Sequence, residues 1–240
     1  MKKIFYFILA LVLGAGNARA LEYEPASGMT YMGFFGMNVS KLQNHLGFDK
    51  AKVGATLGVK VDYVLPRAHG TYLTAGLDWT MKGGKASFYY DPFTERENGT
   101  LTYDLHYLEI PVRVGFRYNM SESLGIYGEV GPYFAIGVGG KHKCRIDADG
   151  SAARADEELY TYPAFKNYDY PKEGFQRWDA GISFRVGAEY EQHYNLMIGC
   201  DWGLADLYRG SYRDAAHDAG VPTLPRVKNF NFSITVGYRF

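Results

Sequence analysis

From residue 53 onward the chain alternates strictly between apolar and polar or small residues, which is the period of a β-strand with two different faces. Seven segments show this alternation with clear faces. An eighth segment, about residues 30–40, is apolar or small on both faces, so the pattern leaves its orientation open. The other seven segments span residues 53–63, 71–82, 108–118, 124–138, 177–191, 194–203 and 229–240.

The two faces of these segments differ completely in charge. The apolar face carries no charged residue, whereas the other face carries both signs. Its cations are Lys60, Lys82, Arg113, Arg117, Arg177, Arg185 and Arg239, and its anions are Asp62, Asp78, Glu109, Glu129, Asp179, Glu189, Glu191 and Asp201. An unpaired buried charge is costly, so we expect these groups to pair in networks, with Glu109, Arg113, Arg117 and Glu129 at the centre. A narrow ion path or gated pore is the functional alternative.

Strand length and connection length favour a membrane barrel over a soluble β-sandwich. Most segments have 11 to 15 residues, whereas strands of globular proteins average ~5–6 and a bilayer requires ~9–11. Short connections (65–70, 119–123, 192–193) alternate with long ones (41–51, 83–103, 139–176, 204–228). The sequence therefore predicts an all-β fold, an eight-stranded antiparallel up-and-down transmembrane barrel. Its termini and short turns would be periplasmic and its long loops extracellular.

The large aromatic residues agree with this arrangement. Trp79, Trp178 and Trp202 fall at the outer ends of strands with the parity of the apolar face. Tyr63, Tyr118, Tyr190 and Tyr238 fall at the inner ends with the same parity. Amphipathic rings favour the two membrane–water interfaces, so these residues predict two aromatic girdles.

The first twenty residues predict export. Lys2 and Lys3 precede an apolar run at residues 4–12, and Ala18-Arg19-Ala20 supplies small residues at a cleavage site. This is the pattern of a secretory signal peptide, which we expect to comprise residues 1–20, followed by one barrel domain at 21–240. An uncleaved anchor is the alternative, but the run is shorter than the ~17 residues that a spanning helix needs.

Three segments resemble the PorT-like outer-membrane β-barrel family, which would make the chain a small barrel of the OmpA/OmpX type. They are Tyr107-Leu108-Glu109-Ile110-Pro111-Val112, Gly131-Pro132-Tyr133-Phe134 and Asp179-Ala180-Gly181. The resemblance implies an integral outer-membrane protein, and the named member of the family takes part in protein secretion. The ending with Tyr238 and Phe240 is similar to the C-terminal signal that the barrel insertion machinery recognises. Pro111 and Pro132 lie inside strands, where we expect a bulge or a water-filled gap.

Candidate sites for chemistry are weak. Five of the six histidines fall in predicted loops or turns, and no two have the spacing of metal ligands. No serine and histidine share the lipid-facing parity of one strand, as a lipid-modifying barrel enzyme would need. We therefore expect no catalytic residue, metal or cofactor. Cys144 and Cys200 could form a disulfide outside the cytoplasm, but free thiols are the simpler expectation.

The long loops offer the best interaction surface. Residues 139–176 contain Tyr160, Tyr162, Phe165, Tyr168 and Tyr170, which could bind a partner or pack on one another to cap the barrel. Residues 85–90 and 99–106 should extend two strands as a hairpin that turns near Asp91-Pro92 and Asn98-Gly99. The expected partners are outer-membrane lipid, the insertion machinery and an envelope or secretion-complex protein. A formal net charge of zero gives no support for nucleic acid or an anionic surface.

Overall fold

The structure, a computed structural model, describes residues 28–43, 50–66, 70–90, 97–147, 157–166, 175–218, 220 and 225–240. Its strands are β1 (Met29–Gln43), β2 (Lys52–Val64), β3 (Thr71–Tyr90), β4 (Glu97–Asn119), β5 (Leu124–Asp147), β6 (Glu157–Pro163), β7 (Trp178–Tyr190), β8 (Tyr194–Gly203) and β9 (Lys228–Arg239). One helix, α2 (Gly210–Asp218), lies in the connection between β8 and β9.

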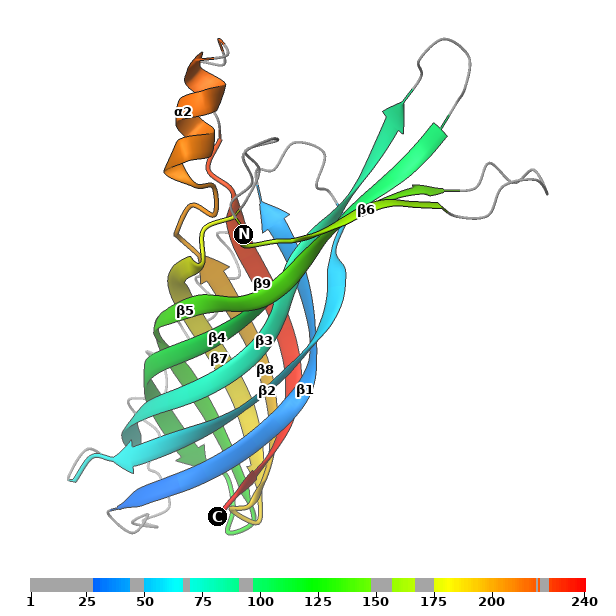
Figure 1. The fold of residues 1–240 in the computed structure, drawn as a ribbon. Coiled ribbons are helices and arrows are strands. Elements are labelled where there is room, and N and C mark those ends of the chain that lie inside the picture. The colour runs from blue at the N-terminus through cyan, green and yellow to red at the C-terminus, as the bar shows by residue number, and fades with distance from the viewer. Residues whose placement is uncertain are drawn as a thin grey trace, which may run out of the picture.

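Eight of these strands form a closed antiparallel ring, in the order β1-β2-β3-β4-β5-β7-β8-β9 (Figure 1). The ring closes where the first strand pairs with the last, for example Phe35 opposite Val236. Closure pairs the backbone of both terminal strands, which a strand in hydrocarbon requires. The predicted eight-stranded barrel is confirmed. Among the described residues, no helix is both long and apolar enough to cross a bilayer.

At the long-loop end, β3, β4 and β5 continue beyond the ring as an extension that leans away from it, and β6 pairs with the upper part of β5 (Figure 1). The predicted hairpin of β3 and β4 is confirmed, but a turn at Asn98-Gly99 is wrong, because both residues pair with β3. The segment 91–92 lies outside the described residues. The predicted loop 139–176 is also partly wrong, because β5 runs to Asp147. Polar residues in this part of β5 obscured its continuation.

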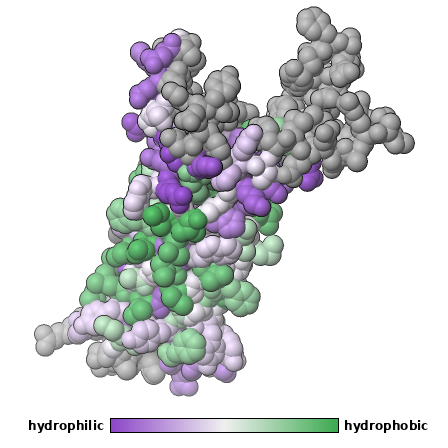
Figure 2. All heavy atoms as spheres, in the orientation of Figure 1, coloured by the Kyte–Doolittle hydropathy of each residue, from purple (hydrophilic) through white to green (hydrophobic). Residues whose placement is uncertain are grey.

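The outer surface of the ring is apolar and the interior is polar, as the alternation predicts. Leu57, Val59 and Ile110 are exposed on the outside, whereas Lys60, Asp62 and Glu109 are buried inside. Figure 2 shows the resulting hydrophobic band on the face in view. The structure also settles the orientation of β1. Its exposed residues are Tyr31, Phe35, Met37 and Val39, and its buried ones are Met32, Asn38, Ser40 and Leu42.

The two prolines inside strands do not produce a bulge. The β3–β4 register is the same on both sides of Pro111, and the β4–β5 register is unchanged past Pro132. Gly76 faces Pro111, where a Cβ atom would lie only 3.3 Å from the proline ring. The absence of that side chain gives the ring room, so the expected bulge is wrong. The pairing of neighbouring residues is nevertheless interrupted at both prolines, and the water-filled gap stays a prediction. The register shift of the β4–β5 pair lies instead between His106 and Tyr107.

Candidate functional site

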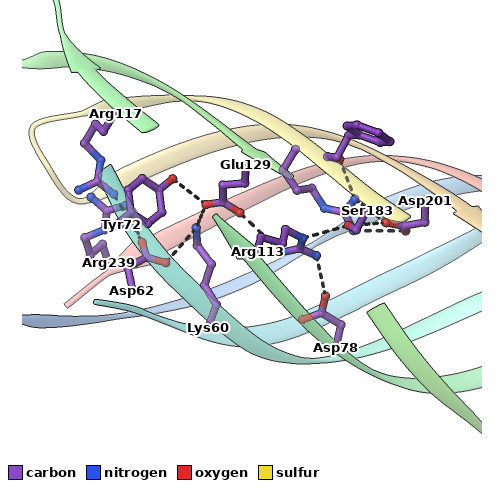
Figure 3. A network of polar contacts seen from close by, with 12 residues as sticks. Lys60, Asp62, Tyr72, Asp78, Arg113, Arg117, Glu129, Ser183, Asp201 and Arg239 are labelled. Carbon is purple, nitrogen blue, oxygen red and sulfur yellow. Dashed lines mark hydrogen bonds and ion pairs between the residues drawn. The ribbon is translucent and has the colours of Figure 1, made fainter. Parts of the chain in front are cut away.

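The interior of the barrel is the most highly organised polar region of the described chain, and at its short-turn end it centres on Glu129. One carboxylate oxygen of Glu129 pairs with Lys60 and accepts a hydrogen bond of 2.8 Å from the Tyr72 hydroxyl. Its other oxygen lies 3.6 Å from Arg113. Lys60 also lies 3.4 Å from Asp62. Figure 3 shows that these side chains come from several strands and meet inside the ring.

Arginines complete this network toward the short turns. Arg117 lies 3.4 Å from Asp62 and 3.5 Å from Glu189. Arg239, the penultimate residue, pairs with the same two carboxylates. The last strand therefore contributes directly to closing the interior. Even the most exposed of these charged side chains, Arg117, is only 10% exposed.

A second group lies in the middle of the barrel around Asp201. This carboxylate accepts hydrogen bonds from Arg185 at 2.6 Å, Ser183 at 2.8 Å and Asn231 at 3.0 Å. The Ser183 hydroxyl also accepts a bond of 2.9 Å from Arg113, so Arg113 connects this group to Glu129. Since each carboxylate has more than one donor, the pairs resist the loss of any single contact.

A third group, below the long-loop end, centres on the completely buried Lys82. Its ammonium nitrogen lies 2.7 Å from Glu109 and 3.8 Å from Asp179. It also lies 4.4 Å from the centre of the Tyr133 ring and 5.8 Å from that of Tyr107, at cation–π distance. The Tyr133 hydroxyl donates a 3.3 Å hydrogen bond to Asp179. The buried ammonium is thereby surrounded by anions and ring faces.

Three interior tyrosine rings lie over glycines that are directly opposite on neighbouring strands. Tyr72 faces Gly115, Tyr127 faces Gly187, and Tyr133 faces Gly181. A Cβ atom at any of these glycines would collide with the facing tyrosine ring. The glycines thus make the space that the rings occupy. The sequence contained this signal, since tyrosines occur on the inward parity opposite glycines, but recognising it required the register.

The predicted charge network is therefore present. Two of the charges predicted to face the interior do not lie there, and the four residues predicted at its centre do not form one group. Glu109, Arg113, Arg117, Glu129, Asp179, Arg185 and Glu189 all take part in the ion pairs and hydrogen bonds above. Arg177 is not an interior charge: it precedes β7, is exposed, and donates a hydrogen bond to the Gly137 carbonyl. Glu191 is exposed in the turn after β7, where its φ of 50° ends the strand. The centre is divided, because Glu109 pairs with Lys82 and Arg117 with Asp62.

Strand ends and connecting segments together form a hydrophobic cap at the long-loop end. The cap consists of Leu42, Ala86, Leu105, Phe165, Phe175, Leu207 and Val227, which are all buried in one cluster with Tyr107 and Tyr133. Backbone hydrogen bonds join its segments, from Phe175 to Ala164, from Gln176 to Leu207 and from Leu207 to Val227. The cap therefore rests directly on the Lys82 group.

Two side chains hold the cap segments together. Arg209 donates hydrogen bonds to the carbonyls of Phe165 at 2.5 Å and Phe175 at 3.2 Å. Asp206 accepts bonds from the backbone nitrogens of Tyr208 and Val227, and from Arg213 at 2.7 Å. Sequence reasoning missed both residues, because contacts between distant loops leave no local pattern.

The aromatic residues of the long loop divide between the cap and the surface. Phe165 is buried and its ring meets Tyr107 edge-on, with centres 5.6 Å apart. Tyr162 is 45% exposed. Tyr160 lies in β6, but its side chain, like the segment with Tyr168 and Tyr170, lies outside the described part. The structure thus gives Phe165 a capping position and leaves Tyr162 at the surface.

The girdle residues have the predicted outward parity. Trp178, Trp202, Tyr63, Tyr190 and Tyr238 are exposed on the barrel exterior, and Trp79 and Tyr118 are partly exposed there. Trp79 also contacts His106, with ring centres 5.4 Å apart. At the C-terminus the rings of Tyr238 and Phe240 are 5.3 Å apart, and the Phe240 nitrogen donates to the Tyr31 carbonyl. The final aromatic residue is thus fixed to the first strand.

Cysteines and histidines form neither a disulfide nor a metal cluster within the part of the chain that the structure describes, and His45 and His69 lie outside that part. The structure describes both cysteines and forms no disulfide between them. The described residues contain no group of three or more possible metal ligands. The prediction that His142 and His217 lie in loops is wrong, because β5 extends through His142 and α2 contains His217.

Comparison with known proteins agrees with this architecture. The family model described as outer membrane protein beta-barrel domain matches residues 17–209. No curated protein matches the chain.

Three solved structures are similar to the chain. Neisserial surface protein A is 14% identical over 89% of this chain and 99% of its own, with a TM-score of 0.40. OprG of Pseudomonas aeruginosa is 11% identical over 89% and 96%, with a TM-score of 0.39. The attachment invasion locus protein Ail of Yersinia pestis is 14% identical over 89% and 99%, with a TM-score of 0.38. By the match over residues 17–209 the chain belongs to the outer membrane protein beta-barrel domain family and is an integral outer-membrane β-barrel.

Proposed function

We propose that this protein is a non-enzymatic barrel with a closed interior, which acts through the segments at its long-loop end. The observation that carries the proposal is the contact between the Lys82 group and the hydrophobic cap. Tyr107 and Tyr133 belong to both, because their rings surround Lys82 and pack in the cap cluster. A solute would have to displace the cap and then separate Lys82 from Glu109.

The interior offers structural support rather than chemistry. The Ser183 hydroxyl is engaged by both Arg113 and Asp201, so no histidine activates it as a nucleophile. Glu129 and Asp201 each accept several charged or polar donors. The ion pairs connect strands across the interior and so shape the barrel, and opening the network would leave charges unpaired in a confined space.

The proposal includes an orientation. Residues 1–20 would direct export as a cleaved signal peptide, and the short turns would then lie in the periplasm. The long connections, the cap and the β3–β6 extension would face outward. These outward segments would make the contacts with an envelope or secretion-complex protein, and Tyr162 is an exposed aromatic residue on them.

Conductance across planar lipid bilayers tests the closed interior. The chain from Leu21 should insert without discrete current steps, and boiled and unboiled samples should differ in gel mobility, which establishes that a closed barrel was added. The variant K82A/E109A/Y133A removes the Lys82 group. It should conduct ions, provided that boiled and unboiled samples of the variant still differ in gel mobility. Current steps from the wild-type barrel at ordinary voltages would overturn the proposal.

The second candidate is an accessory subunit of a secretion complex, as the PorT-like resemblance implies. Glu109 and Tyr133, from the two segments that carry most of the resemblance, meet at Lys82. This supports a shared structural element rather than a coincidental pattern. Affinity purification of the tagged barrel in mild detergent tests the idea, since recovery of a stable multi-protein complex would favour it. Altered lipid A on overexpression would instead favour a lipid-modifying enzyme.

A further inference from the structure

The β3–β5 extension carries a group of lysines on one face. In an antiparallel sheet, residues directly opposite one another lie on the same face. Lys85 lies opposite Thr102, which lies opposite Lys143, and Lys143 lies opposite Thr161 on β6. In the adjacent row, Asp104 lies opposite Lys141. We call Lys85, Lys141 and Lys143 the basic face. Lys85 and Lys141 are exposed and Lys143 is half-buried.

The basic face continues the lipid-facing surface of the barrel. Trp79, Leu108 and Ile136 form a row of facing residues on the barrel exterior. Six residues farther along β3 and β4 the same parity reaches Lys85 and Thr102. Figure 2 shows hydrophilic residues directly above the hydrophobic band. The lysines therefore stand above the girdle on the side that faces the bilayer, rather than above the interior.

The register shift at His106/Tyr107 produces this placement. Below the shift the even-numbered residues of β5 face outward, as exposed Phe134 and Val138 do. Above it the parity reverses, so Lys141 points outward while His142 and Cys144 are buried. Without the extra residue both lysines of β5 would point toward the cap. A bulge that redirects side chains in this way is typical of a functional feature.

Asp104, the acidic residue in these rows, already has a cationic partner. Asp104 pairs with Lys52 at 2.8 Å, and Lys52 is nearly buried. Lys50 donates a hydrogen bond of 2.7 Å to Ser87 on the same face. Among the described side chains of these rows, the three lysines of the basic face therefore exceed the anions available to them. The formal net charge of zero does not show this local excess, because it sums over the whole chain.

The height of the basic face matches a lipid headgroup. At ~3.4 Å per residue and a strand tilt of ~40°, the row of Lys141 starts about 10 Å and the row of Lys143 about 15 Å above Trp79 on β3. The polar headgroup layer begins at the level of the aromatic girdle, and flexible lysine side chains can reach several ångströms back toward it.

We propose that the basic face binds the phosphate groups of the anionic glycolipid in the outer leaflet. Each phosphate would contact more than one ammonium group, with the hydroxyl of Thr102 in the same row as a further donor. The inference rests on the outward orientation of the long-loop end proposed above. Its test does not depend on the interior being closed, so the two can fail separately.

The experiment uses the full mature chain in a zwitterionic detergent. It measures the midpoint temperature at which the gel mobility of the folded barrel changes to that of the unfolded chain. Diphosphoryl lipid A is titrated as the probe, and dephosphorylated lipid A and inorganic pyrophosphate serve as comparison probes. The variant K141Q/K143Q removes two lysines that support no described ion pair. K141R/K143R keeps their charge, and R226Q/K228Q removes two cations near the start of β9.

We expect diphosphoryl lipid A to raise the midpoint for wild type, K141R/K143R and R226Q/K228Q. K141Q/K143Q should fold with an unchanged midpoint but require about 10- to 30-fold more lipid for the same rise, as expected for two cations at a lipid surface. An equal response in K141Q/K143Q and wild type would overturn the proposal. So would an equal rise with the dephosphorylated lipid, an equal rise with pyrophosphate, or an equal loss in R226Q/K228Q.

Discussion

The ammonium group of Lys82 lies 4.4 Å from the centre of the Tyr133 ring, at the level where the charged interior meets the hydrophobic cap. Tyr133 in turn donates to Asp179, which also accepts a 2.8 Å bond from Asn229. β3, β5, β7 and β9 are thus joined across the barrel at one height. This layer couples the interior to the segments that cover it.

Replacing Lys82 by methionine should destabilise the barrel by about 3–5 kcal/mol, because Glu109 and Asp179 would remain buried without their cation. The free energy of unfolding in urea with lipid vesicles measures this. The double variant K82M/E109Q should lose less than the sum of the two single changes, since one removes the charge that the other leaves unpaired. Strict additivity would contradict the pairing of Lys82 with Glu109.

Valine at Gly115 should displace the Tyr72 ring and break its hydrogen bond to Glu129. We expect a loss of at least about 2 kcal/mol, or failure to form the heat-modifiable species. Gly33 provides the matched control, since nothing lies within 4 Å of a Cβ atom there. If G33V and G115V were equally stable, the ring-over-glycine packing would not be what fixes the position of Tyr72.

Arginine at Met37 tests the orientation of β1, which the sequence left open. Met37 is 65% exposed on the barrel exterior, opposite Ile234 and Ala55. A charge on the lipid face near the middle of the bilayer costs about 2–4 kcal/mol, so M37R should fold less stably in vesicles while M37L should behave as wild type. Wild-type stability of M37R would place this residue in water instead.

Alanine at Asp206 should loosen the cap and leave the barrel intact. The change removes the acceptor for two backbone nitrogens and for Arg213. We expect faster hydrogen exchange in residues 204–209 and 225–227, with an unchanged difference in mobility between boiled and unboiled samples. D214A, on an exposed residue of α2, should leave exchange in these segments unaltered. Unfolding of the whole barrel by D206A would show that cap and barrel are one cooperative unit.

The sequence by itself determined the architecture, because seven of the eight barrel strands place apolar side chains toward lipid and polar ones toward the interior. Alternation at Val59, Lys60, Val61 and Asp62 distinguishes lipid from interior without reference to any other part of the chain. The same parity placed the girdle tryptophans and the seven network residues on their correct faces. It could not orient β1, because the small and apolar residues there suit either side.

Tertiary structure alone decided which charges meet and what covers them. Glu109 lies four residues from Arg113 in β4, yet it pairs with Lys82 on the neighbouring strand β3. Register and barrel curvature, rather than spacing in the sequence, set the distances between interior side chains. The turn after β7 excludes Glu191 from the interior, and the register shift at His106/Tyr107 turns Lys141 toward the bilayer. These outcomes depend on contacts between strands and loops far apart in the chain, which local pattern does not encode.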